Sequence, residues 1–125
     1  MIRNAMVLLI LATGTYIAPS AALAQMAAPA YQADPHVYKV IFEDERFRVM
    51  TGTWRPGEGD KPHSHPVPSI VYSLNNCALK VTSASGETRV IKNKAGHAMA
   101  VPFVASHTAK NIGPNACRVL FVEHK

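Results

Sequence analysis

The stretch KPHSHPVPS, residues 61–69, places two histidines one residue apart among three prolines, with no acidic side chain. Two interpretations are open at this point. His63 and His65 form half of a metal site, because imidazole is a common metal ligand, or they are two polar residues on a loop. The residues that the rest of the chain brings near them decide between these alternatives.

The chain around this stretch has an all-β pattern. Short apolar or alternating runs follow one another, among them VYKVIF, FRVMTGTW, SIVYSL, ALKVTS and CRVLFVE. Turn-forming residues separate these runs, at spacings typical of a sandwich or barrel. They are Pro56-Gly57, Asn75-Asn76, Ser85-Gly86, Lys94-Ala95-Gly96 and Gly113-Pro114-Asn115. Past the N-terminal segment, no longer window keeps a helical period without a glycine or proline interrupting it.

Residues 1–24 have the features of a secretory signal peptide. Arg3 precedes an apolar run from Met6 to Ala12, and the small residues Ala22-Leu23-Ala24 precede Gln25. The alternative is a membrane anchor, but this run is far shorter than the roughly 18 residues that a membrane span needs. We therefore expect cleavage before Gln25, a periplasmic or secreted protein, and no membrane association after cleavage.

Residues 25–36 are small, contain prolines and lack periodicity, which predicts a flexible arm before a domain at residues 37–125. Cleavage would leave about 100 residues, a length at which the core buries only ~60 to 65% of the unfolded surface. A domain this small gains stability from an additional cross-link, ligand or subunit contact. The candidates are a disulfide, a bound metal and a homodimer.

The charge of the mature chain is modest. Arg3 is the only charged residue of the segment that would be removed, so the formal net charge falls from +5 to +4. The basic side chains are scattered along the sequence rather than clustered with aromatic residues. This pattern indicates a solvated surface and disfavours nucleic acid as a partner.

In a β-strand, residues two apart point to the same face of the sheet, so His63 and His65 would present their imidazoles side by side. Two ligands alone hold a metal poorly. Most functional sites take a third protein ligand and leave positions open for water or substrate. The metal interpretation therefore depends on another histidine or carboxylate elsewhere in the chain.

Over about residues 37–125 the sequence resembles the small single-domain cupins. The residues that match the two cupin motifs in spacing are Gly57, His63 and His65, then Gly96, Pro102, His107 and Asn111. Three positions depart from the motifs. The glutamate of the first motif is Ser69 (or Ile70), its second glycine is Asn76 (or Cys77), and a glycine of the second motif is Val104.

The resemblance implies an all-β fold, a cupin-type jelly-roll β-barrel. It also implies that His63, His65 and His107 bind one divalent metal at the mouth of the barrel. Ser69 is a poor ligand beside a carboxylate and Glu58 lies on a Pro-Gly turn, so we expect a three-histidine site. Imidazole suits copper, zinc and nickel as well as iron, and iron(II) is favoured if the protein is an enzyme.

The other histidines are expected outside this site: His36 in the arm, His97 after a turn, and His124 near the C-terminus. Large apolar and aromatic residues are expected in the core or the pocket wall. They include Met50, Trp54, Tyr72 and Phe103. No catalytic acid or base can be assigned beside the metal, because Ser69 takes the place of the glutamate.

Three neutral imidazoles leave a bound divalent ion its full charge, which favours a small anionic, chelating ligand. The first hypothesis is an enzyme, an oxidoreductase resembling the three-histidine cupin dioxygenases such as acetylacetone dioxygenase. The second is a non-catalytic periplasmic cupin module that binds a metal or a small molecule. Neutral imidazole is the binding form, so metal affinity should fall as the pH drops through roughly 6.5.

The two cysteines, Cys77 and Cys117, are expected in a compartment that favours disulfides. In a jelly roll the strand at about residues 70–75 lies antiparallel to the last strand, at about residues 117–123. The end of one strand then meets the start of the other, near both cysteines. Either a disulfide or two buried thiols suits this corner.

Overall fold

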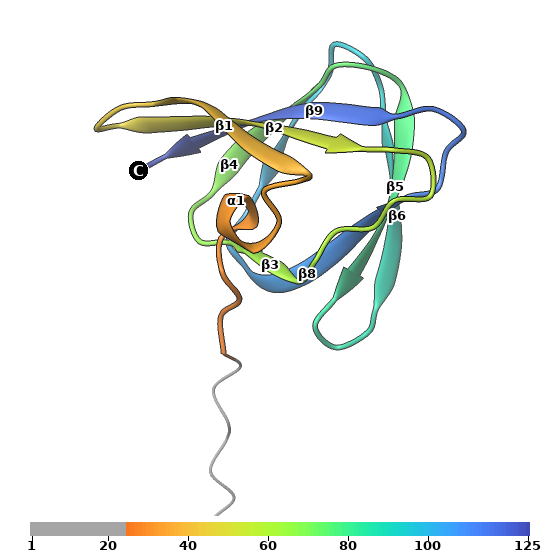
Figure 1. Cartoon of the computed structure of the whole chain (residues 1–125), viewed down its shortest axis with the longest axis horizontal. Coiled ribbons are helices and arrows are strands. Elements are labelled where there is room, and N and C mark those ends of the chain that lie inside the picture. Colours follow the sequence, from red (N-terminus) through yellow and green to blue (C-terminus); the bar gives the residue numbers. More distant parts are fainter. Residues whose placement is uncertain (1–24) are drawn as a thin grey trace, which may run out of the picture.

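The computed structural model describes residues 25–125, which form two antiparallel sheets folded against each other (Figure 1). One sheet has the order β1-β2-β9-β4-β7 and the other β3-β8-β5-β6. The elements are α1 (Ala30–Ala33), β1 (Tyr38–Glu43), β2 (Phe47–Trp54), β3 (His63–His65), β4 (Ser69–Ser73), β5 (Cys77–Ser83), β6 (Thr88–Asn93), β7 (Ala98–Val101), β8 (Val104–Asn111) and β9 (Cys117–His124). The predicted all-β jelly-roll architecture is confirmed.

The strands follow from the two-residue periodicity of their side chains. In β9 the buried residues Cys117, Val119 and Phe121 alternate with residues that are exposed or half-buried. This strand lies at the centre of the five-stranded sheet, between β2 and β4. The inward side chains of both sheets form one core. It contains Tyr38, Met50, Trp54, Val71, Leu79, Val81, Ala109, Val119 and Phe121.

Two motif glycines have the backbone geometry that their position requires. Gly57 has φ 77° and Gly96 has φ 82°, in the left-handed region that side chains with a Cβ rarely adopt. Gly57 lies in the turn before β3, which carries His63 and His65, and Gly96 lies in the turn before β7, which pairs with β4. The two motif positions therefore carry glycine because their turns require a positive φ.

Residues 27–34 are packed against the barrel, which differs from the expected flexible arm. The Ala27 amide donates to the Ala105 carbonyl, and the Ser64 amide donates to the Ala28 carbonyl. Ala30 is buried in the core. These contacts use backbone groups and one small side chain, so they leave no hydrophobic period in the sequence. The domain boundary at residue 37 stays a prediction.

Residues 1–24, the predicted signal peptide, lie outside the described residues. Within residues 25–125, no helix has the length and apolar character needed to cross a membrane.

Of the two alternatives left open for Cys77 and Cys117, the structure has the disulfide, with the two Cα atoms 5.2 Å apart. As expected, β4 and β9 are antiparallel neighbours, with Ser73 opposite Val119. Cys77 begins β5, which belongs to the other sheet. The bond therefore ties the two sheets together at one end of the barrel.

Candidate metal centre

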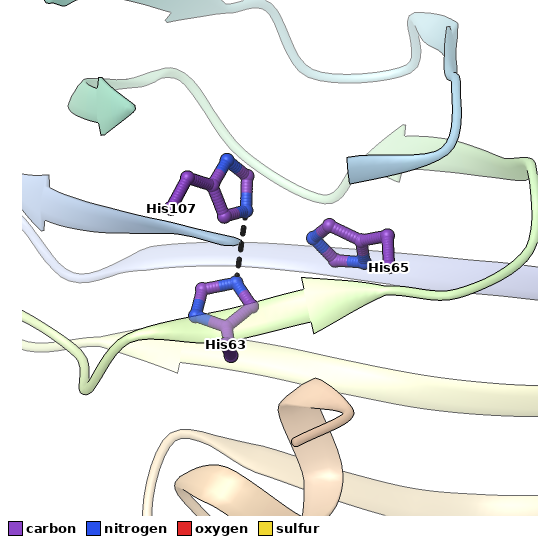
Figure 2. A group of neighbouring side chains, drawn as sticks. All are labelled: His63, His65 and His107. Carbon is purple, nitrogen blue, oxygen red and sulfur yellow. Dashed lines mark hydrogen bonds between the residues drawn. The ribbon is translucent and has the colours of Figure 1, made fainter. Parts of the chain in front are cut away.

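Three histidines from two neighbouring strands converge inside the barrel. β3 and β8 are antiparallel, with His63 opposite His107 and a register shift before His65. One ring nitrogen from each of His63, His65 and His107 lies within 4.8 Å of the others. Figure 2 shows the three rings turned toward a common space between the strands. The three residues singled out in the sequence thus form one cluster.

The orientation of His63 is set by its backbone neighbour. Its Nδ1 lies 2.9 Å from the carbonyl oxygen of Lys61, which can only accept a hydrogen bond. In the tautomer that donates from Nδ1 to this carbonyl, Nε2 keeps its lone pair. That Nε2 lies 3.0 Å from Nε2 of His107, so the free lone pair points into the cluster. A hydrogen bond on the far nitrogen is how proteins usually orient a metal-binding histidine.

A buried carboxylate, Asp60, supports this part of the site. It accepts hydrogen bonds from the Tyr38 hydroxyl at 2.7 Å, the Trp54 indole at 3.0 Å and the Ala109 amide at 2.6 Å. Its Oδ1 is 3.7 Å from Nδ1 of His63. Desolvation raises the pKa of Asp60, while His63 and these donors act in the opposite direction. Asp60 thereby joins β1, β2 and β8 directly behind the cluster.

His65 provides the test of whether the site suits a metal. Its ring stacks on Phe121, with centroids 5.4 Å apart and planes at 19°. Its Nδ1 is buried and has no hydrogen-bond partner within the described structure. A buried polar atom without a partner is costly, and a metal ligand bond is one way to satisfy an imidazole nitrogen. The chemistry of the three residues therefore fits a divalent metal.

The environment keeps two of the imidazoles neutral. Burial, followed by the nearby His63, lowers the pKa of His65 to about 4. Burial, followed by His63, His65 and Arg89, lowers the pKa of His107 to about 3. Neutral imidazole is the form that binds metals. At neutral pH both rings are thus already in the ligand form.

The cluster lies between an interior cavity and an open cleft. The cavity, of about 60 Å³, reaches His65 and His107 from inside the barrel, and its walls are largely apolar. The cleft, of about 670 Å³, includes His107, Ser83, Ser106 and Arg89. His107 and Arg89 border both spaces. A ligand could therefore place a small group near the histidines while the rest of it lies in the cleft.

Similar proteins are found by structure, whereas the sequence matches no protein-family model and no curated protein. A cupin domain from Bordetella pertussis Tohama I has a TM-score of 0.66 at 19% identity, covering 71% of this chain and 92% of its own. An RmlC-like cupin with a double-stranded β-helix fold from Methanocaldococcus jannaschii has a TM-score of 0.58 at 17% identity, covering 70% and 78%. A protein with a double-stranded β-helix domain from Klebsiella pneumoniae has a TM-score of 0.57 at 20% identity, covering 70% and 75%.

The chain has the cupin fold. At these identities the likeness concerns the fold alone, so function has to be argued from the residues of this cupin barrel.

The remaining histidines lie outside the cluster, as expected. His36 contacts Glu58 at 3.1 Å on the surface, His97 is exposed after its turn, and the His124 ring packs edge-on against Phe47. Within residues 25–125, no carboxylate joins the three histidines. Ser69, in place of the motif glutamate, is buried with its hydroxyl unpartnered.

Three residues near the site were not identified from the sequence. Tyr38 lies with its hydroxyl 3.0 Å from Nε2 of His63, Asp60 lies behind His63, and Arg89 borders the cavity. Of the three, Asp60 was the easiest to find in the sequence, because it is an acidic residue three positions before His63. Its role depends on Tyr38, Trp54 and Ala109, which approach it only in the folded barrel. No acid beside the metal was assigned from the sequence, and the structure places Asp60 behind His63, where three donors already hold it.

The two lowered pKa values revise the expected pH dependence of metal affinity, because protons compete for His65 and His107 near pH 4 and 3 rather than near 6.5. They also make the stability of the metal-free protein depend on pH. The unfolded chain binds protons at ordinary histidines near pH 6.5, whereas folded His65 and His107 bind them only near pH 4 and 3. The metal-free protein should therefore be most stable above pH 6.5 and lose stability as the pH falls toward 4. Thermal unfolding measured from pH 7.5 to 4, with NMR titration of both rings, checks this. Midpoints near 6.5 for both histidines would contradict it.

Proposed function

We propose that the protein is an exported metal-binding cupin that acts as a non-haem iron(II) dioxygenase-like oxidoreductase on a small anionic, chelating substrate. The observation that carries the proposal is the cluster of three histidines, two of them held neutral, with no carboxylate among them in residues 25–125. Three neutral ligands leave the charge of a divalent ion uncompensated and leave positions for further ligands.

The residues around the cluster support an anionic substrate. Arg89 borders the same cavity and cleft as His107, and its charge contributes to the lowered pKa of His107. Within residues 25–125, Arg89 forms no ion pair although Glu87 lines the same cleft, whereas the half-buried Arg48 is paired with Glu43 and Glu123. Its guanidinium is thus free to bind a carboxylate or enolate oxygen.

Each part of the site has a separate role in this proposal. His63, His65 and His107 would hold the metal, and the Asp60 network would keep the His63 ring in place. An iron(II) ion bound there would supply the redox chemistry for oxygen. Apolar walls contributed by Val71, Val119 and other residues restrict water in the cavity, and Arg89 would orient the anionic end of the substrate.

The experiment that tests the function combines metal analysis with oxygen uptake. Protein purified from the periplasm should contain iron at one atom per chain. It should consume oxygen with at least one member of a panel of diketones, catechols and thiols. Tightly held copper or zinc, with no uptake across the panel, would instead support the second candidate function.

That second candidate is a non-catalytic periplasmic module that binds a metal or a small molecule. It is favoured by Asp60, the acid beside the cluster, whose oxygens already accept three hydrogen bonds. A carboxylate held in this way is poorly placed to transfer protons to a substrate.

Export has its own test. Mass spectrometry of the mature protein should show a chain that begins at Gln25, either unmodified or as pyroglutamate, because the small-residue pattern before Gln25 is a cleavage signal. A membrane-bound form that retains Met1 would contradict both the cleavage site and the proposed location.

The role of Arg89 gives a further prediction. Arg89→Gln should weaken binding of glycolate, a chelating α-hydroxy acid, to the zinc-loaded protein by about 10-fold or more, because a charge-assisted hydrogen bond is lost. Zinc is redox-inert, so calorimetry measures binding without turnover. Arg46→Gln, in the exposed turn between β1 and β2, is the matched control. Equal effects of the two substitutions would exclude a specific role for Arg89.

A further inference from the structure

The register of the four-stranded sheet gives the depth of the interior cavity below the histidines. From the cleft inward, the facing residues of β8, β5 and β6 form three rows: His107 and Ser83, then Ala109, Val81 and Arg89, then Asn111, Leu79 and Ile91. Successive rows are two residues apart, about 7 Å along a strand. Val81, Leu79 and Ile91 line the cavity together with His107. The cavity therefore leads from the histidine end of the barrel past two rows that contain aliphatic side chains.

The polar groups in the cavity wall are engaged elsewhere or lie at the histidine end. The Tyr38 hydroxyl and the Trp54 indole both donate to Asp60, so these two side chains contribute ring surface to the wall. The amide nitrogen of Asn93 contacts both sulfur atoms of the disulfide, at 3.6 and 3.7 Å, and Asn93 lies one row beyond Ile91. A hydroxyl or charged group that entered the cavity would find few partners, and burying a polar group without a partner is unfavourable.

The size of the cavity limits what can enter it. Its volume is about 60 Å³, whereas one molecule of liquid water takes up about 30 Å³. A methyl or methylene group is close to water in size, so the cavity has room for roughly two carbon atoms. Buried aliphatic residues surround it, among them Val71, Leu79 and Val119. A longer chain would have to displace close-packed side chains, which is unfavourable.

We propose that the substrate carries a short apolar substituent, of about two carbon atoms, beside its chelating group, and that this substituent occupies the cavity. The inference rests on the proposed function, because it takes the chelating group to be held by the metal and Arg89. The substrate class is then a short-chain aliphatic anion, such as an alkyl-substituted α-hydroxy acid or enolate, and not a sugar acid or an anion with a large aromatic group.

Ile91 is the residue that sets the accepted chain length. It lies two positions after Arg89 on β6, so both side chains are on the inner face of the same strand. Arg89 borders the cleft and the cavity, whereas the half-buried Ile91 packs against the core one row deeper. A substrate whose anionic end is held by Arg89 therefore directs an adjacent substituent toward Ile91.

Calorimetry with a series of α-hydroxy acids on the zinc-loaded mature protein tests the inference. Affinity should rise about fourfold per added carbon from glycolate to lactate to 2-hydroxybutyrate, the gain expected for each buried methylene, and should fall again for 2-hydroxyhexanoate. Glycerate matches 2-hydroxybutyrate in size but has a hydroxyl in place of the terminal methyl group. It should bind about 10-fold more weakly than 2-hydroxybutyrate, because that hydroxyl is buried without a partner.

Ile91→Ala enlarges the cavity at its third row and should move the optimum toward longer chains. 2-Hydroxyhexanoate should bind about 10-fold more tightly to this variant than to the wild type, because the removed side-chain atoms leave room for its last carbons. The matched control is Ile112→Ala, the same change at a residue that is 48% exposed and lies outside the cavity. This control should leave all affinities in the series unchanged.

Circular dichroism shows whether each variant is folded, and Ile91→Val replaces Ile91→Ala if the latter does not fold. Xenon binding to the metal-free protein separates the cavity from the metal site. Apolar cavities bind xenon, so the NMR signals of the Leu79 and Ile91 methyl groups should shift under xenon pressure while those of Ile112 do not.

The outcomes distinguish this inference from the proposed function on which it rests. An absent xenon response, affinities that do not depend on chain length, or equal binding of glycerate and 2-hydroxybutyrate would overturn the inference and leave the proposed function intact. Equal effects of Ile91→Ala and Ile112→Ala would remove the role of Ile91. If none of the hydroxy acids bound to the zinc-loaded protein, the inference and the proposed function would both fail.

Discussion

Replacing His107 with alanine should lower the affinity for a divalent metal by roughly 100-fold or more, while the barrel stays folded. Loss of a residue that merely supports a ligand typically costs 10- to 100-fold, and the loss of one of only three protein ligands should cost at least as much. The folded state depends mainly on the apolar residues between the sheets. The measurement is zinc affinity by competition with a chromophoric chelator, with circular dichroism for each variant.

The matched control for this prediction is His97→Ala. His97 is exposed and lies outside the cluster, so its removal should leave the affinity within about twofold of wild type. His63→Ala and His65→Ala should behave like His107→Ala. If His107→Ala kept wild-type affinity, or if His97→Ala lost as much, the three-histidine assignment and the proposed function would both have to be withdrawn.

The all-β class and the pairing of His63 with His65 could be predicted from local spacing, and the resemblance to the cupins implied the jelly-roll barrel and the third histidine. Residues two apart in a strand share a face, so His63 and His65 belong together in any register of β3. The resemblance to the second cupin motif, from Gly96 to His107, then implied the third residue. The same reasoning could not find Asp60 or Arg89, since their places depend on which strands become neighbours. Arg89 lies on β6, which pairs with β5 rather than with either strand of the cluster.

The strand β4 shows a second limit of sequence patterns. In SIVYS, alternation alone does not say which set of side chains faces the core. Ser69, Val71 and Ser73 are buried, whereas Ile70 and Tyr72 are exposed. Hydrophobicity would favour the opposite orientation for most of these residues. Pairing with β9 decides which side chains of β4 face the core, because Val71 lies opposite the buried Phe121 and Ile70 opposite the half-buried Val122. The exposure of Ile70 and Tyr72 could therefore not be predicted before the register was known.

Breaking the bond between Cys77 and Cys117 should have the largest effect on stability. The two cysteines are 40 residues apart in the sequence, and opening a closed loop of that size costs about 3 to 4 kcal/mol in the chain-entropy model. In a domain of about 100 residues, this corresponds to a decrease in Tm of about 12 to 30 °C. The bond also joins β5 to β9 across the two sheets, so its loss should loosen the end of the barrel where both strands begin.

Comparing the wild type with and without reductant isolates the cross-link, because the reduced protein keeps both sulfur atoms. The double variant Cys77→Ala/Cys117→Ala should unfold at or below the temperature of the reduced wild type, since Cys117 is fully buried and its truncation also leaves a small cavity. Adding reductant to this variant should change nothing. Titration of thiols in the unfolded, unreduced wild type should detect none per chain. Two reactive thiols, or equal Tm values for oxidised and reduced protein, would show that the two sheets are held together by the apolar core alone.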